Sequence, residues 1–274
     1  MPSAPPPLTV FTPIYRVDHD YFALTMNSVL SQSFGDFEYL LINDGDPADA
    51  ERILDTYRDP RIRVINQPAR QGLALSRNRG LHEARAELIA MIDGDDWCEP
   101  ERFAKQVAFL REQRDHILVG SDLRLVDEHS RPVGYRRYPR TDAEIKPRMI
   151  LGNCIAQPAV IARRQALIAA GGYTTEFAWA EDYDLWLRAA RLGKFHNLPE
   201  ALVSYRFHDD SGKTRLLKPA LRDSTRLKIH AIRRYGYPAT PRALLNVAMH
   251  AALLPLPDAL ILWLFKKLTV RAAR

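Results

Sequence analysis

Short apolar runs alternate with longer segments of helical periodicity over the first 119 residues of the chain. The apolar runs have the length and composition of strands buried on both faces, and we expect them at residues 8–11, 38–42, 62–65, 88–92 and 117–119. The segments between them repeat apolar residues three and four positions apart, which predicts helices at residues 21–32, 48–57, 72–84 and 100–113. This alternation predicts an α/β fold with a mostly parallel sheet flanked by helices.

The alternation is lost in the second half of the chain. Residues 127–152 are basic and polar, and we expect irregular structure there. An amphipathic helix is predicted to begin near Glu181 and Asp182 and to run to Leu192, and residues 203–204 resemble a short strand. Because carboxylates are favoured at the start of a helix, the two acidic residues have a purely structural explanation as well as a functional one.

The C-terminal region combines basic and apolar segments. Residues 213–234 predict a basic helix, and residues 243–254 and 258–270 are apolar segments separated by Pro255 and Pro257. Neither segment approaches the ~20 uninterrupted apolar residues of a transmembrane helix. The last segment has an apolar body and a cationic end, which favours a helix lying at a membrane interface. Packing against the core or against a partner chain is the alternative.

Charge is distributed unevenly, and this strengthens the division of the chain into two parts. From residue 213 onward there are 13 Lys and Arg residues against two Asp, whereas the preceding 212 residues carry 26 basic and 31 acidic side chains. We therefore expect a globular domain at residues 1–212 and a basic, helical extension at residues 213–274. A basic extension favours a polyanionic partner, and nucleic acid and anionic lipid both qualify.

The remaining composition favours a folded cytoplasmic protein. The two cysteines, Cys98 and Cys154, form neither a CxxC pair nor a framework of disulfides, as in a reducing compartment. Residues 1–7 are rich in Pro and lack the basic and apolar regions of a signal peptide, so we expect a short disordered lead.

Three carboxylates stand within four residues directly after the fourth predicted strand, at Asp93, Asp95 and Asp96. Crowded carboxylates repel one another and are costly to desolvate, and a divalent cation removes that cost. Mg²⁺ or Mn²⁺ takes oxygen ligands and bridges one or two carboxylates to substrate phosphates. Asp and Gly also form turns without any chemistry, but open α/β sheets bind ligands at this end of their strands. The stretch therefore predicts a metal-dependent enzyme that acts on a phosphorylated donor.

Five short motifs follow one another at the ends of predicted strands and at the starts of predicted helices. They are Thr12-Pro13-Ile14-Tyr15, Asn43-Asp44-Gly45, Gly72-Leu73-Ala74-Leu75-Ser76-Arg77-Asn78, Asp93-Gly94-Asp95-Asp96 and Glu181-Asp182-Tyr183-Asp184. Together they resemble the family 2 glycosyltransferases, which have the GT-A fold, over about residues 8–208. The resemblance implies an enzyme that transfers a sugar, with inversion, from a nucleotide-sugar donor to an acceptor hydroxyl.

The resemblance assigns donor-binding roles to residues of the first half. Thr12, Pro13 and Tyr15 would line the pocket of the nucleotide base. Asp44 would accept a hydrogen bond from the base ring N–H, which favours uracil or thymine, or it would only form a turn. Arg77 would lie near the nucleotide and its phosphates, or would be a solvated helix charge.

The acidic cluster and a later histidine are assigned to the metal. Asp93 would contact the ribose or a metal-bound water, and Asp95 would bind the Mn²⁺ or Mg²⁺ ion. Asp96 would support these residues or serve as an alternative ligand. His208 resembles a histidine near the metal or diphosphate, although a lone histidine is often structural.

The resemblance makes Asp182 the candidate general base, with Glu181 as a supporting residue. Glycosyl transfer needs a carboxylate that takes the proton of the acceptor hydroxyl as its oxygen attacks the anomeric carbon. The metal holds the charge of the departing diphosphate. A single base on the face opposite the leaving group gives inversion by direct displacement, so no carboxylate nucleophile is needed.

The chain departs from the processive members of the family. No QxxRW motif follows the acidic pair, and no membrane span is predicted. We therefore expect an enzyme that adds one sugar at a time to a glycan or a lipid-linked acceptor. An acceptor at the cytoplasmic face of the plasma membrane would explain the basic extension. We then expect the extension to bind an anionic membrane surface and not nucleic acid.

Two alternatives from other classes stay open at this point. Aspartyl phosphatases and phosphotransferases also place DxD at a strand end, but after the first strand and with Thr at the position that Trp97 occupies here. A nucleic-acid-binding module would use residues 213–234 and would bind with a steep inverse salt dependence. It leaves the acidic motifs unexplained.

Overall fold

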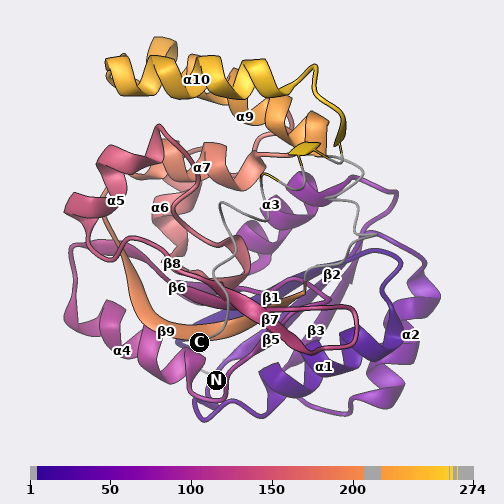
Figure 1. The fold of residues 1–274 in the computed structure, drawn as a ribbon. Coiled ribbons are helices and arrows are strands. Elements are labelled where there is room, and N and C mark those ends of the chain that lie inside the picture. The colour runs from indigo at the N-terminus through magenta and orange to yellow at the C-terminus, as the bar shows by residue number, and fades with distance from the viewer. Residues whose placement is uncertain (1–4, 207–216, 259, 262–263, 265–274) are drawn as a thin grey trace.

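The computed structural model describes residues 5–206, 217–258, 260–261 and 264 of the 274-residue chain (Figure 1). Within these residues the centre of the molecule is one nine-stranded sheet, with helices on both of its faces. The predicted α/β fold with a mostly parallel sheet flanked by helices is confirmed.

The sheet combines a parallel half with a mixed half. Its strands are β1 (Leu8–Ile14), β2 (Glu38–Asn43), β3 (Ile62–Asn66), β4 (Leu88–Met91), β5 (Trp97–Cys98), β6 (His116–Val126), β7 (Pro132–Arg136), β8 (Ile161–Arg163) and β9 (Lys194–Arg206). The order is β3-β2-β1-β4-β8-β6-β9-β5, and β7 pairs with β6. The pairs among β3, β2, β1 and β4 are parallel, as is β6 with β9, whereas β8, β5 and β7 are antiparallel to their neighbours.

Helices cover both faces of the sheet. They are α1 (His19–Leu30), α2 (Pro47–Thr56), α3 (Leu73–Glu83), α4 (Arg102–Glu112), α5 (Asp142–Met149), α6 (Arg164–Ala169), α7 (Glu181–Ala189), α9 (Leu217–Arg234) and α10 (Pro241–Leu253), with a 3₁₀ turn, η1, at Gln157–Ala159. Alternate residues of each strand point to opposite faces, so each strand feeds two cores. In β4, Ile89 and Met91 join the core beneath α3 and α5–α7, whereas Leu88 and Ala90 join the core against α1 and α4 (Figure 1).

The predicted irregularity of residues 127–152 is wrong, because this segment contains β7 and α5. Helix α5 begins with a capping box, in which Thr141 and Glu144 each accept a hydrogen bond from the other's backbone N–H. Such reciprocal capping satisfies two amide donors at the helix start. The basic, polar composition concealed it, because α5 has few apolar positions.

Strands β6 and β9 are longer than predicted, at 11 and 13 residues. Polar residues interrupt their apolar pattern, but these side chains form hydrogen bonds inside the fold. The carboxylate of Asp122 in β6 accepts hydrogen bonds from the guanidinium of Arg140 at 2.7 Å and from the backbone N–H of Tyr138 at 2.9 Å. In β9, the amide of Asn197 donates to the carbonyl oxygens of Pro139 and Cys154. Strands that carry paired polar groups do not show as apolar runs.

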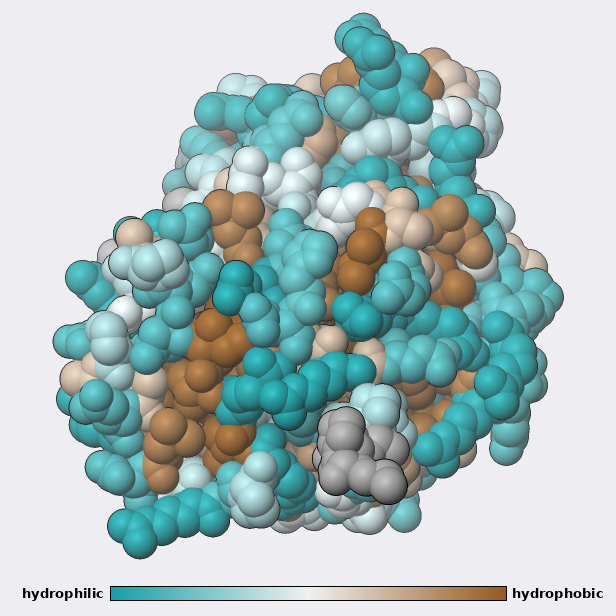
Figure 2. All heavy atoms as spheres, turned by 180° about the vertical axis from the view of Figure 1, so that it is seen from behind, coloured by the Kyte–Doolittle hydropathy of each residue, from teal (hydrophilic) through white to brown (hydrophobic). Residues whose placement is uncertain are grey.

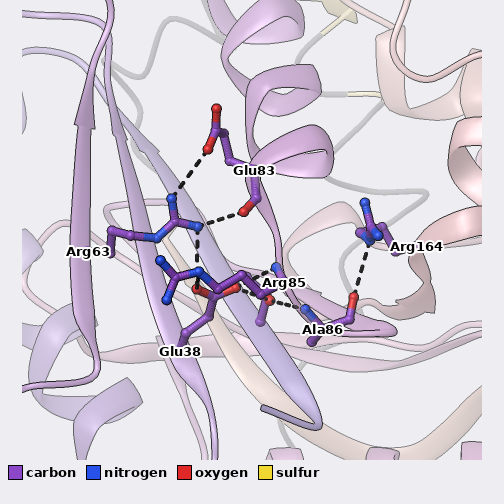
Figure 3. Close-up of polar contacts among 7 residues, drawn as sticks. Glu38, Arg63, Glu83, Arg85, Ala86 and Arg164 are labelled. Carbon is purple, nitrogen blue, oxygen red and sulfur yellow. Dashed lines mark hydrogen bonds and ion pairs between the residues drawn. The ribbon is translucent and has the colours of Figure 1, made fainter. Parts of the chain in front are cut away.

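A cluster of ion pairs closes the edge of the sheet where β2 begins (Figure 3). The Glu38 carboxylate accepts hydrogen bonds from the Thr9 hydroxyl at 2.6 Å and from the Arg85 backbone N–H at 2.7 Å. The Arg63 guanidinium lies 3.4 Å from the same carboxylate and also contacts Glu83 (Figure 3). The cluster therefore ties β1, β2, β3 and the end of α3 together.

Helices α9 and α10 pack on the helical layer that contains α7 (Figure 1). Leu227 and Ala231 of α9 and Ala243 of α10 belong to the same core as α7. Within the described residues no helix has both the length and the apolar character needed to cross a membrane.

Candidate functional site

The predicted site residues gather where β1, β2 and β4 end. These strands are parallel neighbours, with Ile14 opposite Asn43 and Phe11 opposite Met91, so their carboxyl ends lie at one edge of the sheet. The Tyr15, Asp44 and Asp93 motifs follow directly on these strands. In such sheets this edge is where ligands bind.

The Asp44 carboxylate holds the loop that leads into α3. One of its oxygens accepts hydrogen bonds from the Gln67 side-chain amide at 2.8 Å and from the Gln71 backbone N–H at 2.6 Å, and the other accepts from the Gly72 N–H at 2.7 Å. Gly72 has a φ of 89°, a conformation that glycine adopts without strain. Asp44 is thus buried and fixed beside the predicted base pocket, with a structural task in addition to its predicted one.

The first motif places its three predicted residues at different depths. Thr12 is buried, and its hydroxyl shares a 3.0 Å hydrogen bond with the Tyr39 hydroxyl. Pro13 is partly buried, and the Tyr15 ring is exposed. The guanidinium of Arg70 lies over this ring, 4.4 Å from its centroid. Tyr15 therefore lies at the surface of the molecule, whereas Thr12 lies in the interior.

Arg77 is not a solvated helix charge. Its side chain in α3 is only 5% exposed. The guanidinium lies 2.8 Å from the Asp93 carboxylate and forms a second ion pair with Glu181. Because Asp93 follows β4 and Glu181 begins α7, Arg77 joins the donor side of the site to the helix that carries the candidate base.

The Asp182 carboxylate is held at both oxygens. One accepts a hydrogen bond from the Tyr183 backbone N–H at 2.7 Å, in the first turn of α7, and the other accepts from the Asn153 side-chain amide at 3.0 Å. Burial raises the pKa of Asp182 above its usual range, and the nearby Arg77 acts in the opposite direction. Burial likewise raises the pKa of Glu181 against the effect of Arg77.

Asn153 was not predicted from the sequence. It stands in the segment between α5 and η1, 29 residues before Asp182, and no local motif marks it. Gln67, which holds Asp44, was missed for the same reason. Both contacts depend on how distant segments pack.

The other two acidic residues of the DxDD stretch lie against the end of β9. Asp96 is fully buried and accepts a hydrogen bond from the Arg206 backbone N–H at 2.8 Å. The Arg206 side chain donates to the Asp95 backbone carbonyl at 3.2 Å and stacks over the Tyr21 ring. Asp96 therefore occupies a supporting position, and Asp95 is partly exposed in the turn beside Asp93.

The described residues contain no group of three His, Cys, Asp or Glu side chains arranged to hold a metal ion. His208 lies outside the described residues. Asp93 and Asp95 provide carboxylates at the edge of the site. This donor set fits Mg²⁺ or Mn²⁺, because these ions are bound by one or two carboxylates together with substrate phosphates and water.

Comparison with known sequences finds a matching family and several relatives. The model of the family described as "Glycosyl transferase family 2" matches residues 9–169, more than half of the chain. The O-antigen biosynthesis glycosyltransferase WbnJ of Escherichia coli is 30% identical over 210 residues, covering 74% of this chain and 81% of WbnJ. The putative glycosyltransferase EpsE of Bacillus subtilis is 32% identical over 240 residues, covering 85% of this chain and 84% of EpsE.

Solved structures share the fold at low sequence identity. TarS of S. aureus superposes with a TM-score of 0.63 and 20% identity, covering 90% of this chain and 42% of TarS, so the chain spans less than half of that protein. The mannosyltransferase PcManGT from Pyrobaculum calidifontis, in complex with GDP-Man and Mn²⁺, gives a TM-score of 0.65 and 17% identity, covering 97% of this chain and 81% of PcManGT. A fragment of TarS, residues 1–349, has been solved with UDP-GlcNAc.

Proposed function

The chain belongs to glycosyl transferase family 2, and we propose that it moves a single sugar from a nucleotide-sugar donor to an acceptor hydroxyl with inversion. The observation that carries this proposal is the position of Arg77. Its two ion pairs bring the end of β4, where the donor would bind, next to the acidic start of α7. Glycosyl transfer requires a donor site and a base close together, and the ion pairs of Arg77 connect the two candidates.

On the donor side we favour a UDP- or dTDP-linked sugar. Asp44 stands beside the pocket predicted for the base, where a carboxylate oxygen would accept the ring N–H of uracil or thymine. The same oxygens already accept three hydrogen bonds from the protein, which fix their direction. The fold neighbours have been solved with UDP-GlcNAc and with GDP-Man, so the type of base is decided by residues of this chain and not by the fold.

On the acceptor side Asp182 would act as the general base. Its carboxylate takes the proton of the acceptor hydroxyl while that oxygen attacks the anomeric carbon from the face opposite the diphosphate. The new carbon–oxygen bond forms as the bond to the diphosphate breaks, and the electron pair leaves with the nucleoside diphosphate. The proton stays on Asp182 until solvent takes it, so the atoms and charges balance without a covalent intermediate.

Asp95 would hold a Mn²⁺ or Mg²⁺ ion together with the donor phosphates, and Asp93 would contact the ribose or a water on the ion. When bound, such an ion stabilises the negative charge that develops on the leaving diphosphate. Arg77 keeps the Asp93 carboxylate in place from within the protein, and Asp96 fixes the turn from below by its bond to β9.

The acceptor is proposed to be a glycan, or a lipid-linked glycan at an anionic membrane surface in the cytoplasm. Two features of the C-terminal helices support this. Helix α10 exposes Leu244, Leu245 and Met249, and α9 exposes Arg222 and Arg226. Figure 2 shows apolar and hydrophilic side chains side by side on the projecting end of the molecule that α9 and α10 form. An apolar face near cationic residues is typical of helices that lie on anionic membranes.

A thermal-shift screen of UDP-, dTDP- and GDP-sugars, with and without Mn²⁺, tests the proposal. A ligand that binds only the folded state raises the melting temperature. We expect a UDP- or dTDP-sugar to raise it in the presence of Mn²⁺, and Asp95→Ala to lose the part that depends on Mn²⁺. The Asp182→Asn variant should keep the shift but lose turnover by a factor on the order of 10² or more. A metal-dependent shift that persists in Asp95→Ala contradicts the metal assignment, and unchanged turnover in Asp182→Asn contradicts the base.

A further inference from the structure

The side-chain amide of Asn153 is held in one orientation by the backbone. Its oxygen accepts a hydrogen bond from the Ile155 N–H at 3.1 Å, and its nitrogen donates to Asp182 at 3.0 Å. If the amide were turned over, its NH₂ group would face the Ile155 N–H, and its oxygen would face a carboxylate. Both contacts would then pair like with like. The Ile155 N–H therefore ensures that a donor, and never an acceptor, points at Asp182.

The segment that carries Asn153 is itself fixed at several points. The Lys228 ammonium of α9, which is fully buried, donates to the Leu151 carbonyl at 2.9 Å. The Asn197 amide of β9 donates to the Cys154 carbonyl at 3.1 Å. The Tyr183 hydroxyl donates to the Met149 carbonyl just before the segment. A segment held from α7, α9 and β9 keeps its side chains in place without help from a ligand, which is the condition for a precise positioning role.

We propose that Asn153 is a positioning residue, which holds the Asp182 carboxylate in a fixed plane and in its ionised form. The inference rests on the proposed function, because it matters for catalysis only if Asp182 is the base. A general base must be deprotonated before the acceptor arrives, and it must point at the acceptor oxygen. The Tyr183 N–H fixes one carboxylate oxygen and Asn153 fixes the other, so the plane of the group is determined.

The surroundings of Asp182 explain why such a donor is needed. Burial favours the neutral acid and raises its pKa. Glu181 and Tyr183 act on Asp182 from its own helix, α7. The groups that act on it from elsewhere are Arg77 of α3, Asp93 after β4, Tyr138 after β7 and Tyr173 before α7. Arg77 is the cation among them, and it is already paired with two other carboxylates. Arg77 is thus shared among Asp93, Glu181 and Asp182. The hydrogen bonds from Asn153 and from the Tyr183 N–H therefore add to the stabilisation that Arg77 gives to ionised Asp182.

The test is a direct titration of Asp182 by NMR of ¹³C-labelled aspartate carboxyl groups in the full chain, with the signal assigned by its loss in Asp182→Asn. In Asn153→Ala we expect the pKa of Asp182 to rise by on the order of one unit, because a hydrogen bond to the charged form is lost. In Asn153→Asp, which keeps the size of the side chain, the added carboxylate should raise the apparent pKa of the pair further. Asn27→Ala, on the exposed side of α1, is the matched control and should leave the Asp182 signal unchanged.

Each result has a definite meaning. An Asp182 pKa that is unchanged or lower in Asn153→Ala, while the melting temperature shows a folded protein, overturns the inference. If Asn153→Ala does not fold, Asn153→Ser, whose shorter side chain withdraws the donor from Asp182 without adding a charge, decides in the same way by the direction of the shift. Binding of UDP, measured by calorimetry, should be equal in the wild type and in Asn153→Ala, because the change is on the acceptor side. If instead Asp182→Asn keeps full turnover, Asp182 is not the base. The titration then still decides whether Asn153 lowers the pKa of Asp182.

Discussion

At the scale of single residues, Arg77 determines the electrostatics of the candidate site. Its buried guanidinium has one carboxylate partner at the end of β4 and another at the start of α7. A buried charge is tolerated only when it is paired, and removing one member of the group leaves the others uncompensated. Asp93, Arg77 and Glu181 therefore act as one unit, although 16 and 104 residues separate their pairs along the chain.

Replacing this arginine should be costly for stability as well as for function. We expect Arg77→Ala to lower the free energy of unfolding by about 3–5 kcal/mol, because the buried Glu181 and the partly buried Asp93 lose their cation. Arg79→Ala on the same helix is the matched control, since that side chain is half exposed and its ion pair among the described residues is with Glu83. Its cost should stay below about 1 kcal/mol. Urea unfolding of both variants measures the difference, and equal costs would show that the Arg77 network carries no stability.

The raised pKa of Asp182 predicts a pH dependence of stability. Because burial raises this pKa in the folded state, the unfolded chain releases its proton first as the pH rises. Ionised Asp182 then favours the unfolded state, so stability falls between the ordinary aspartate pKa and the raised value. Asp182→Asn cannot ionise, so it removes this dependence on pH. Its stability relative to the wild type should therefore increase as the pH rises from about 4 toward neutral. Urea unfolding at a series of pH values measures this, and a difference that does not change with pH contradicts it.

The sequence could point to the charged members of the site but not to the residues that hold them. Asp93, Arg77 and Asp182 lie in motifs whose order along the chain resembles a family. Asn153 and Gln67 belong to no motif, and their contacts form only when distant segments are packed. A hydrogen bond between side chains leaves no periodic trace in a sequence, so such partners become visible only in the structure.

At the scale of elements, the sequence predicted best those strands that are buried on both faces. Such strands read as continuous apolar runs, which is why β1, β2 and β4 were found. The edge strand β3 was also found, although its residues are partly exposed. Strands β5 and β8 have only two and three residues, too few for a pattern. In β6 and β9, buried polar residues such as Asp122 and Asn197 are paired within the protein and hide the strands. The second half of the chain was therefore the harder half to predict.

The Glu38 cluster gives a prediction at this scale, because one carboxylate ties β1, β2 and β3 together. Glu38→Gln keeps the shape of the side chain but removes the charge that Arg63 and the Arg85 N–H contact. We expect a loss of about 1.5–3 kcal/mol in the free energy of unfolding, as for hydrogen bonds to charged groups. Glu87→Gln, an exposed carboxylate with a single ion pair to Arg163, is the control and should cost far less.

Binding of the nucleotide donor should be unchanged in Glu38→Gln, since the cluster lies where β2 begins and the site lies where it ends. Calorimetric titration with UDP measures this separation. A variant that loses donor affinity without losing stability would contradict the structural role of the cluster.

At the scale of the whole molecule, the C-terminal helices have one side packed against the body of the protein and another side exposed. Towards the body, Ala243 is buried, and Asn246 accepts a hydrogen bond from the Lys228 ammonium at 2.6 Å. Burial lowers the pKa of Lys228 to about 8, so this contact is strongest below that pH. Towards the outside, α10 exposes Leu244, Leu245 and Met249. Deleting the extension would remove both faces at once, so substitutions on the outer face alone give the sharper test of a membrane role.

The outer face predicts salt-dependent binding to anionic membranes. Leu244, Leu245 and Met249 are each more than half exposed, and buried apolar area drives such helices into the interface. The exposed residues of α9 include Arg222, Arg226 and Arg233, and a basic residue near an anionic leaflet adds about 1 kcal/mol. Wild type should therefore co-sediment with phosphatidylserine-containing vesicles at low salt and less at high salt, and it should not bind pure phosphatidylcholine. Changing the three apolar residues to Gln should abolish vesicle binding without affecting the affinity for the donor. The control is Leu54→Gln, at an exposed position of α2, which should bind vesicles as the wild type does. If the wild type ignores anionic vesicles at low salt, or the triple variant binds as well as the wild type, the outer face of α10 is not a membrane surface.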